Sequence, residues 1–220
     1  MNQPHLVYFA DPMCSWCYGF APVIEAIRAE FGHRLPIRLI LGGLRPGTTT
    51  PMDDAAKTRT RAHWDHVQEA SDQVFDYAFF ERDGFVYDTE PACRAVVWVR
   101  RQSSEAALDL LDHLHHAFYG GNRDITDPAV LADIVSKAGF DPAAFAANFT
   151  DAELVKETER DFQISQQTGV TGFPTLIAGK GGDSDYALLT AGFQVKQRIL
   201  PALAWWLDHQ QGSAQDENAI

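Results

Sequence analysis

The chain has 220 residues, of which 45% are hydrophobic and 11% aromatic, enough for a buried core and too apolar for a globally disordered protein. Its formal net charge is −12, from 30 acidic and 18 basic residues. A nucleic-acid-binding surface needs clustered Lys and Arg, so this balance argues against nucleic acid as the main partner.

The N-terminal segment resembles neither a secretion signal nor a membrane anchor. It has no basic start, and the apolar run that begins at Leu6 ends at Asp11. No other stretch approaches the roughly 18 apolar residues of a membrane span. We therefore expect a cytoplasmic protein with no membrane partner, in a compartment where structural disulfides are rare.

The first 41 residues predict a strand, a helix and a second strand. Residues 5–10 are largely β-branched and aromatic, and a turn with proline ends the run. After Cys14, apolar residues recur at spacings of three or four, the period of a helix, and Pro22 is expected to kink it. Residues 35–41 are almost all apolar, which is typical of a strand buried on both faces. Strands joined in this way are expected to be parallel.

A linker at 46–51 is followed by about 100 residues of predicted helix. Asp127 and Asp141 each precede a proline, the pattern of an N-cap followed by proline at the first helical position. In chain order, the expected helices occupy about 53–75, begin at Glu90, Ser104, Asp127 and Asp141, and cover 152–167.

Strand character returns near the end of the chain. Residues 174–178 and 186–189 flank a glycine-rich turn over 179–185, and together they predict a hairpin. Residues 194–209 predict a final helix.

This order of elements predicts an α/β fold, with a mixed sheet and helices on both faces. The sheet domain would be discontinuous, formed by residues 1–46 and 155–220. Residues 47–154 would form an inserted all-helical domain.

The segment Cys14-Ser15-Trp16-Cys17 carries the clearest chemistry. Cysteines three residues apart at the start of a helix can form a disulfide within one turn. At the first position, unpaired helix N–H groups and the helix dipole favour a thiolate. We therefore expect Cys14 to attack and Cys17 to resolve the mixed disulfide.

The alternative is that Cys14 and Cys17 are two ligands of a zinc ion. A structural zinc site needs two further ligands, and the only other cysteine is Cys93. The strand–helix–strand context favours a redox pair, so we predict no metal.

These features resemble a known family. Residues 11–19, Asp-Pro-Met-Cys-Ser-Trp-Cys-Tyr-Gly, and Gly42-Gly43-Leu44 are similar to the thioredoxin superfamily, within it to the DsbA family, and most of all to its FrnE-like cytosolic branch. The resemblance implies a thioredoxin-like fold with an inserted helical domain. It also implies a thiol–disulfide oxidoreductase or protein disulfide isomerase that acts on protein or peptide thiols and disulfides. No bound cofactor is expected, and glutathione is a candidate co-substrate.

A second motif, residues 169–175 (Gly-Val-Thr-Gly-Phe-Pro-Thr), is similar to the cis-proline loop of this family. Pro174 is then the expected cis-proline, although a proline that merely opens a strand is an alternative. The resemblance implies that Phe173 offers its backbone to a substrate strand. Trp16 is expected to form an aromatic platform for peptide or glutathione, or else to pack on the inserted helices.

Two departures from the family pattern are visible. Tyr8 stands where many thioredoxin-like proteins have a buried carboxylate that helps the resolving thiol exchange its proton. Asp11 is nearer to Cys14 and is expected either at the substrate site in that role or as a residue that shapes the turn. The Ser15-Trp16 dipeptide has no histidine, so a strongly oxidising pair is not implied and the direction of electron flow stays open.

Other polar or reactive residues have less specific interpretations. Cys93 is expected to be a small buried hydrophobic residue. His113, His115 and His116 are expected mainly on a solvated helix face. Two further function classes compete: a glutathione-dependent transferase or isomerase of the kappa-class type, whose members typically have serine at the Cys14 position, and a chaperone or peptide-binding module that needs no redox turnover.

Overall fold

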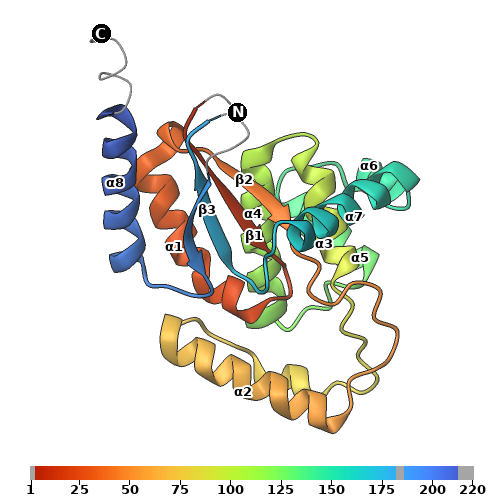
Figure 1. Cartoon of the computed structure of the whole chain (residues 1–220). Coiled ribbons are helices and arrows are strands. Elements are labelled where there is room, and N and C mark those ends of the chain that lie inside the picture. Colours follow the sequence, from red (N-terminus) through yellow and green to blue (C-terminus); the bar gives the residue numbers. More distant parts are fainter. Residues whose placement is uncertain (1–2, 182–185, 213–220) are drawn as a thin grey trace.

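The computed structural model describes residues 3–181 and 186–212. Its strands are β1 (His5–Ala10), β2 (Ile37–Leu41), β3 (Thr175–Gly179) and β4 (Tyr186–Ala191). They form one mixed sheet in the order β2-β1-β3-β4, seen at the centre of Figure 1. The predicted α/β fold with a mixed sheet is therefore confirmed.

The strand directions bring three loops to one end of the sheet. β1 and β2 are parallel, with Tyr8 opposite Leu39, so both chains leave the sheet at the same edge. β3 runs antiparallel to β1, with Phe9 opposite Thr175, so β3 begins at that edge. The segment after β1, the segment after β2 and the segment before β3 consequently meet there.

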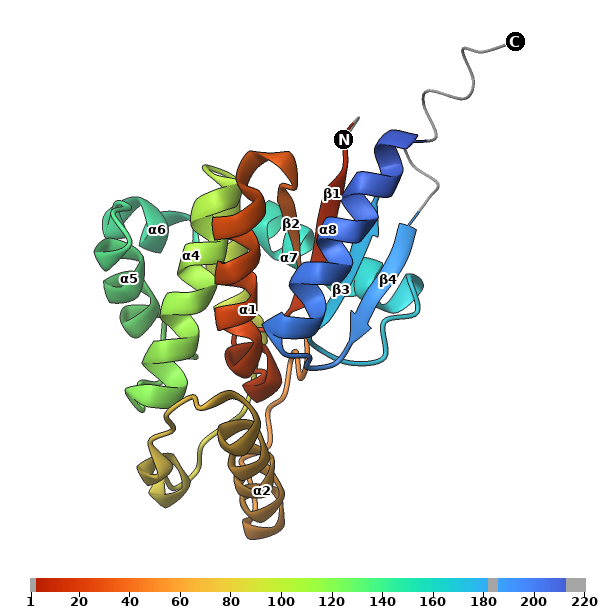
Figure 2. The ribbon, with the colours of Figure 1, turned by 90° about the vertical axis from the view of Figure 1, so that its left-hand side faces the viewer.

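The two faces of the sheet are covered by different helices. Along β1, Leu6 and Tyr8 join the main hydrophobic cluster, whereas Val7 and Phe9 join a smaller cluster on the opposite face. Helices α1 (Ser15–Phe31) and α8 (Lys196–Gly212) lie side by side over the first face, as Figure 2 shows. Helix α7 (Ala152–Gln167) packs against β2 from the other side.

The segment between β2 and α7 contains the remaining helices. Asp127 and Asp141 are N-caps that accept hydrogen bonds from backbone N–H groups, as predicted. The helices of this segment are α2 (Asp54–Ser71), α3 (Glu90–Arg100), α4 (Ser104–His115), α5 (Pro128–Lys137) and α6 (Pro142–Asn148), with short helical turns at η2 (Tyr77–Glu81) and η3 (His116–Gly120). A further short turn, η1 (Gly32–Arg34), lies before β2.

Residues 72–89 depart from the helical character expected of the segment as a whole, and the helix expected over about 53–75 ends at Ser71. Only the η2 turn is helical there, and the rest is irregular loop. The segment is held by aromatic packing instead: the ring centroid of Trp64 lies 5.1, 5.1 and 4.7 Å from those of Phe75, Phe79 and Phe80. Such packing needs no helical period, so it leaves no helical stripe in the sequence.

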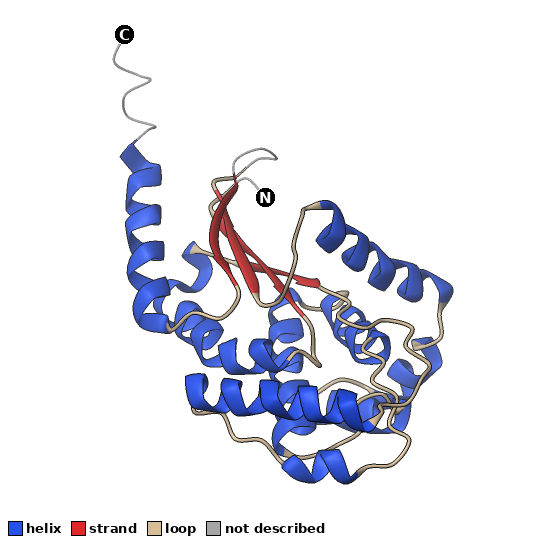
Figure 3. Ribbon diagram, turned by 60° about the horizontal axis from the view of Figure 1, so that its bottom comes forward, coloured by secondary structure: helices blue, strands red, loops and turns tan. Residues whose placement is uncertain are grey.

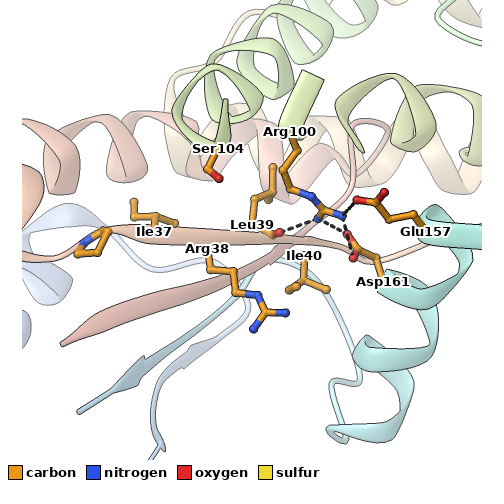
Figure 4. Close-up of a pocket in the computed structure, with 9 residues that line it drawn as sticks. Ile37, Arg38, Leu39, Ile40, Arg100, Ser104, Glu157 and Asp161 are labelled. Atoms are coloured by element: carbon orange, nitrogen blue, oxygen red, sulfur yellow. Dashed lines mark hydrogen bonds and ion pairs between the residues drawn. The ribbon is translucent and has the colours of Figure 1, made fainter. Parts of the chain in front are cut away.

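The outer edge of β2 is closed by side chains rather than by another strand. Arg100 Nη1 donates to the Leu39 carbonyl at 2.9 Å, and the Leu41 N–H donates to Asp161 Oδ2 at 2.9 Å. Arg100 and Asp161 also form an ion pair with each other, with Glu157 beside it. Figure 4 shows this network at one side of a pocket of about 580 Å3. An open strand edge is thereby partly blocked.

The predicted hairpin is confirmed, because β3 and β4 are antiparallel neighbours. Residues 182–185 of its predicted turn lie outside the described residues. The predicted division between 154 and 155 falls within the first turn of α7, and the main hydrophobic cluster continues across it. Figure 3 shows helices on both sides of the sheet. Within residues 3–181 and 186–212, no helix is long and apolar enough to span a membrane.

Candidate active site

The two cysteines lie where β1 turns into α1. Cys14 is the N-cap of α1, and its carbonyl accepts the N–H groups of Cys17 at 3.0 Å and Tyr18 at 3.1 Å. Both cysteines are free thiols. Cys14 is 5% exposed and Cys17 is fully buried behind it. Cys14 is therefore the more accessible of the two thiols, and a dithiol reaction needs an accessible attacking thiol with the resolving thiol beneath it.

The loop before β3 lies against the first thiol. The Phe173–Pro174 peptide bond is cis. Cys14 Sγ lies 3.6 Å from the carbonyl oxygen of Phe173 and can donate to it. Gly42, which directly follows β2, makes room for this contact, because a Cβ on Gly42 would lie 2.1 Å from Phe173 Cζ.

A cleft of about 440 Å3 opens in front of Cys14. One wall is the Cys14–Trp16 turn with Phe173, and the opposite wall comes from α2 and the segment after β2. Arg45, Arg59 and His63 line that opposite wall and are exposed, while the chain as a whole carries a net charge of −12. Figure 1 shows α2 crossing beyond the N-terminal end of α1. The cleft therefore presents basic groups to whatever approaches Cys14.

The sequence does not indicate the basic wall. The pattern over residues 53–75 predicts only a polar helix, and nothing distinguishes Arg59 and His63 from other surface cations. Their spacing of four places them on one face of α2, which is the only signal available in the sequence.

Trp16 is half-buried and contributes to the cleft. Its ring packs against Phe193, at 5.6 Å between ring centroids. Phe193 belongs to the segment between β4 and α8, so this ring contact is with the sheet domain and not with the inserted helices. Trp16 therefore packs against Phe193 and also lines the cleft.

Asp11 does not line the cleft, so the predicted contact with substrate is not what the structure shows. Its carboxylate is fully buried and accepts the N–H groups of Met13 at 2.8 Å and Leu44 at 2.7 Å. These bonds tie the segment after β1 to the segment after β2, which is the turn-shaping alternative. Burial raises the pKa of the Asp11 carboxyl, although both backbone N–H groups lower it.

Cys93 is fully buried, as expected for a small hydrophobic residue. Its thiol lies 3.5 Å from Asp11 Oδ2 and donates to it. Burial and the neighbouring Asp11 raise the pKa of the Cys93 thiol well above the ordinary value. Within the described part of the chain, no group of three or more His, Cys, Asp or Glu side chains could hold a metal ion.

The prediction of a solvated histidine cluster is wrong for His115. His113 and His116 are exposed, but His115 is only 1% exposed and its Nε2 lies 3.2 Å from the Asp11 carbonyl. The reason is helical periodicity: His115 follows Leu111 by four residues and so lies on the apolar face of α4. Burial lowers the pKa of His115 to about 4.

Tyr8 and Cys17 are buried together beneath the site. Tyr8 belongs to β1 and is 1% exposed. Burial, followed by the nearby Cys17 and Cys14, raises the pKa of the Tyr8 hydroxyl well above the ordinary value. Burial is also the main cause that raises the pKa of the Cys17 thiol. A buried thiol of this kind needs help to lose its proton.

Solved structures with the same arrangement of elements exist. A candidate protein disulfide isomerase from Nitrosomonas europaea is 35% identical, with 94% of this chain and 99% of that chain covered and a TM-score of 0.87. The cytosolic disulfide reductase DsbM from Pseudomonas aeruginosa is 22% identical, with 96% and 98% covered and a TM-score of 0.71. DsbM has also been solved with GSH.

The curated relatives include the ClpXP adapter protein SpxH of Bacillus subtilis, 24% identical over 90% of this chain and 67% of the relative. SpxH of Shouchella clausii is 27% identical over 80% of this chain, and the match covers 58% of that relative. The model of the DSBA-like thioredoxin domain matches residues 5–194. The finer likeness to the FrnE-like branch stays a prediction. The chain belongs to the family of DSBA-like thioredoxin domains.

Proposed function

We propose that the protein is a thiol–disulfide oxidoreductase that acts through Cys14 and Cys17. The observation that carries this proposal is the position of the Cys14 thiol at the start of α1, 3.6 Å from the Phe173 carbonyl, with the Cys17 thiol buried behind it. The family membership and the disulfide-handling neighbours support the same class of activity.

The reaction follows from the two thiols. In the reducing direction, the Cys14 thiolate attacks a substrate disulfide, forms a new S–S bond and releases one substrate thiolate. Cys17 then loses its proton and attacks the Cys14 sulfur, which breaks the mixed disulfide and releases the second substrate thiolate. The substrate gains two electrons and the Cys14–Cys17 pair loses them. The reverse sequence oxidises a substrate dithiol, and a partial sequence isomerises disulfides.

The substrate is held by backbone and by charge. An extended peptide can pair with the backbone of Phe173 next to the cis-Pro174 bond, in the manner of strand addition. Arg45 and Arg59 on the opposite wall suit a substrate with carboxylates near its sulfur. Glutathione, with two carboxylates, fits this description, as do acidic segments of a protein.

The cellular role that suits this site is reduction or isomerisation in the cytoplasm. The neighbour DsbM is described as a cytosolic disulfide reductase. The chain has no histidine between its two cysteines to favour the thiolate of Cys14 strongly, so a reducing role is chemically reasonable.

A second candidate function is that of an adapter that binds a protein without redox turnover. The curated relatives named ClpXP adapter proteins favour it. The kappa-class alternative has less support, because that chemistry uses no second thiol and Cys17 lies directly behind Cys14.

The decisive test traps the intermediate. The Cys17→Ala variant should accumulate a mixed disulfide with an acidic peptide disulfide, which mass spectrometry detects on Cys14. Cys14→Ala should form none, and the matched control Cys93→Ala should cycle like the wild type in an insulin reduction assay with glutathione.

The adapter alternative gives different results in the same experiments. If the wild type never forms the Cys14–Cys17 disulfide and reduces no insulin, the oxidoreductase proposal fails. Stimulation of ClpXP degradation that survives replacement of both cysteines by serine would then support an adapter.

A further inference from the structure

The resolving step needs a group that accepts the proton of the Cys17 thiol, and Cys17 does not line the cleft. Cys17 is fully buried, and its thiol must lose a proton before it can attack. The carboxylate nearest the pair in the loop, Asp11, is committed to the N–H groups of Met13 and Leu44 and to the Cys93 thiol. The proton of Cys17 therefore needs another acceptor.

Tyr8 is the first candidate. Its hydroxyl is buried, and it has no hydrogen-bond partner of good geometry within residues 3–181 and 186–212. Buried polar groups normally have partners, so an unpaired hydroxyl in a core calls for an explanation. The Cys17 thiol lies near enough to this hydroxyl to interact with it.

His115 is the second candidate, and its tautomer follows from its one hydrogen bond. Nε2 lies 3.2 Å from the Asp11 carbonyl, which can only accept, so Nε2 carries the hydrogen. Nδ1 is then a bare base, and it too lacks a hydrogen-bond partner among the described residues. A neutral imidazole with a free lone pair can accept a proton, and because burial lowers the pKa of His115 to about 4, it passes the proton on rather than keeping it.

The two unpaired atoms belong to residues that line one narrow pocket. Tyr8 and His115 line it together with Asp112 and Glu25. The pocket has a volume of about 10 Å3, near the least volume that admits one water molecule. It lies between α1, which carries the exposed Glu25, and α4, which carries the half-buried Asp112; Figure 2 shows these helices beside each other.

We propose that Tyr8 and His115 form a proton path from the Cys17 thiol to the surface, with a water in the narrow pocket as the link. The path rests on the oxidoreductase function proposed above. As the Cys17 sulfur attacks Cys14, its proton passes to the Tyr8 oxygen while the Tyr8 proton passes through the water to His115 Nδ1. The proton then leaves past Asp112. The Cys17–Cys14 bond forms, the bond between Cys14 and substrate breaks, and the departing substrate thiolate takes up a proton from solvent.

The charged and titratable groups that face this path come from the loop before α1, from α1 itself, from α4 and from η3. Among the described residues, Cys14 and Asp11 approach Cys17 from the loop before α1. Asp112 approaches Tyr8 from α4, and Glu25 lines the pocket from α1. The titratable neighbours of His115 are His116 of η3 and the rings of Tyr18 and Tyr119. Burial raises the pKa of the Asp112 carboxyl, so Asp112 is suited to exchange protons with solvent nearer neutral pH.

The test separates the two thiol steps in one reaction with Ellman's reagent, which places a coloured thiol on Cys14 as a mixed disulfide. The first equivalent of thionitrobenzoate released reports attack by Cys14, and the second reports resolution by Cys17. For Tyr8→Phe we expect the second phase to slow about 100-fold near pH 7, the lower end of the effect of general acid–base catalysis, with the first phase unchanged. The defect should shrink as the pH rises, because hydroxide replaces the missing acceptor. His115→Gln keeps an N–H donor for the Asp11 carbonyl and should show the same pattern.

Tyr119→Phe is the matched control, since it also removes a buried hydroxyl but lies outside the narrow pocket. Its second phase should equal that of the wild type. If Tyr8→Phe slows both phases equally at every pH, or slows neither, the proton path is refuted. If the wild type itself releases only one equivalent, it is the oxidoreductase function that fails, not the path alone.

Discussion

Gly42 lies directly against the ring of Phe173, so closely that a Cβ on Gly42 would come within 2.1 Å of Cζ, 2.4 Å of Cε1 and 2.5 Å of Cε2. The segment after β2 therefore supports the residue whose carbonyl faces the Cys14 thiol. A glycine at this point is required by space and not by its backbone angles, because a side chain there would occupy the same volume as the ring.

Replacement of Gly42 by alanine should displace Phe173, whose carbonyl faces the Cys14 thiol. The added methyl group must displace the Phe173 ring or the loop, and overpacking of this kind costs about 1–3 kcal/mol in the free energy of unfolding. We expect a shift of the urea midpoint that corresponds to this loss, together with a severalfold fall in the rate at which Cys14 reduces a peptide disulfide.

Gly172→Ala is the control for this prediction. Gly172 adjoins Phe173 in the sequence, but a Cβ there would meet nothing within 4 Å. Its free energy of unfolding should change by less than about 0.5 kcal/mol, as for ordinary surface substitutions. Equal effects of the two substitutions would contradict the role assigned to Gly42.

The sequence predicts the reactive residues of the site better than it predicts the residues that support them. The Cys14–Cys17 spacing, the following helix and the Phe173-Pro174 segment are local patterns, and the structure brings them together as the family resemblance implies. Gly42 could be interpreted only as a turn or a groove residue, because the ring that it accommodates lies 131 positions away in the chain and no local pattern indicates it.

The basic wall of the cleft predicts selectivity for anionic substrates. Arg59 lines the cleft, so Arg59→Gln should raise the KM for glutathione disulfide about three- to fivefold at low ionic strength, with the effect reduced by added salt. The KM for the uncharged bis(2-hydroxyethyl) disulfide should not change. Steady-state kinetics with both substrates measure this difference.

Arg61 provides the matched control, because it lies on the same helix but stacks over Tyr77 and Phe80, at 5.2 Å and 4.6 Å from their ring centroids. Arg61→Gln removes the same charge without altering the cleft. If both variants raise the KM for glutathione disulfide equally, the effect results from the lower net charge and not from the position of Arg59 in the cleft wall.

The partners of the buried polar residues cannot be predicted from the sequence. His115 lies close in the sequence to His113 and His116, which are both exposed, and its residue type alone would predict the same for His115. The helical period places His115 inside, but only the tertiary structure supplies the Asp11 carbonyl as its partner. For Asp11 the sequence allows either a substrate residue or a turn residue, because the N–H of Leu44 that its carboxylate accepts belongs to a residue 33 positions later.

His115 should also set part of the acid stability of the fold. Its pKa is lowered from the ordinary 6.5 to about 4 in the folded protein, so the unfolded chain binds a proton between these values and the folded chain does not. Stability is therefore full above about pH 6.5 and falls as the pH drops toward 4, by up to about 3 kcal/mol. His115→Gln should remove this contribution, as urea unfolding at a series of pH values would measure.

His113→Gln is the control, because His113 is exposed on the same helix. Its unfolding free energy should follow that of the wild type at every pH. Parallel curves for the wild type and His115→Gln would show that the buried imidazole does not titrate with unfolding.

The ion pair at the edge of β2 yields the last prediction. The side chains of Arg100 and Asp161 are 17% and 6% exposed, and Figure 4 shows both directed at the backbone of β2. Arg100→Met would leave the Asp161 carboxylate buried without its cation and the Leu39 carbonyl without its donor. Removal of one partner of a buried pair costs about 3–5 kcal/mol. Chemical unfolding of Arg100→Met should therefore show a loss of about this size.

The adjacent arginine separates this effect from a general loss of charge. Arg101 pairs with Glu157 at 2.7 Å, but the two side chains are 36% and 31% exposed. Exposed pairs contribute about 0–1 kcal/mol, because solvent screens the attraction, so Arg101→Met should cost no more than that. Added salt should reduce the small effect of Arg101→Met and leave most of the large effect of Arg100→Met, because the buried pair is screened less. Similar losses in the two variants would mean that the pair at the β2 edge is no more buried in solution than its neighbour.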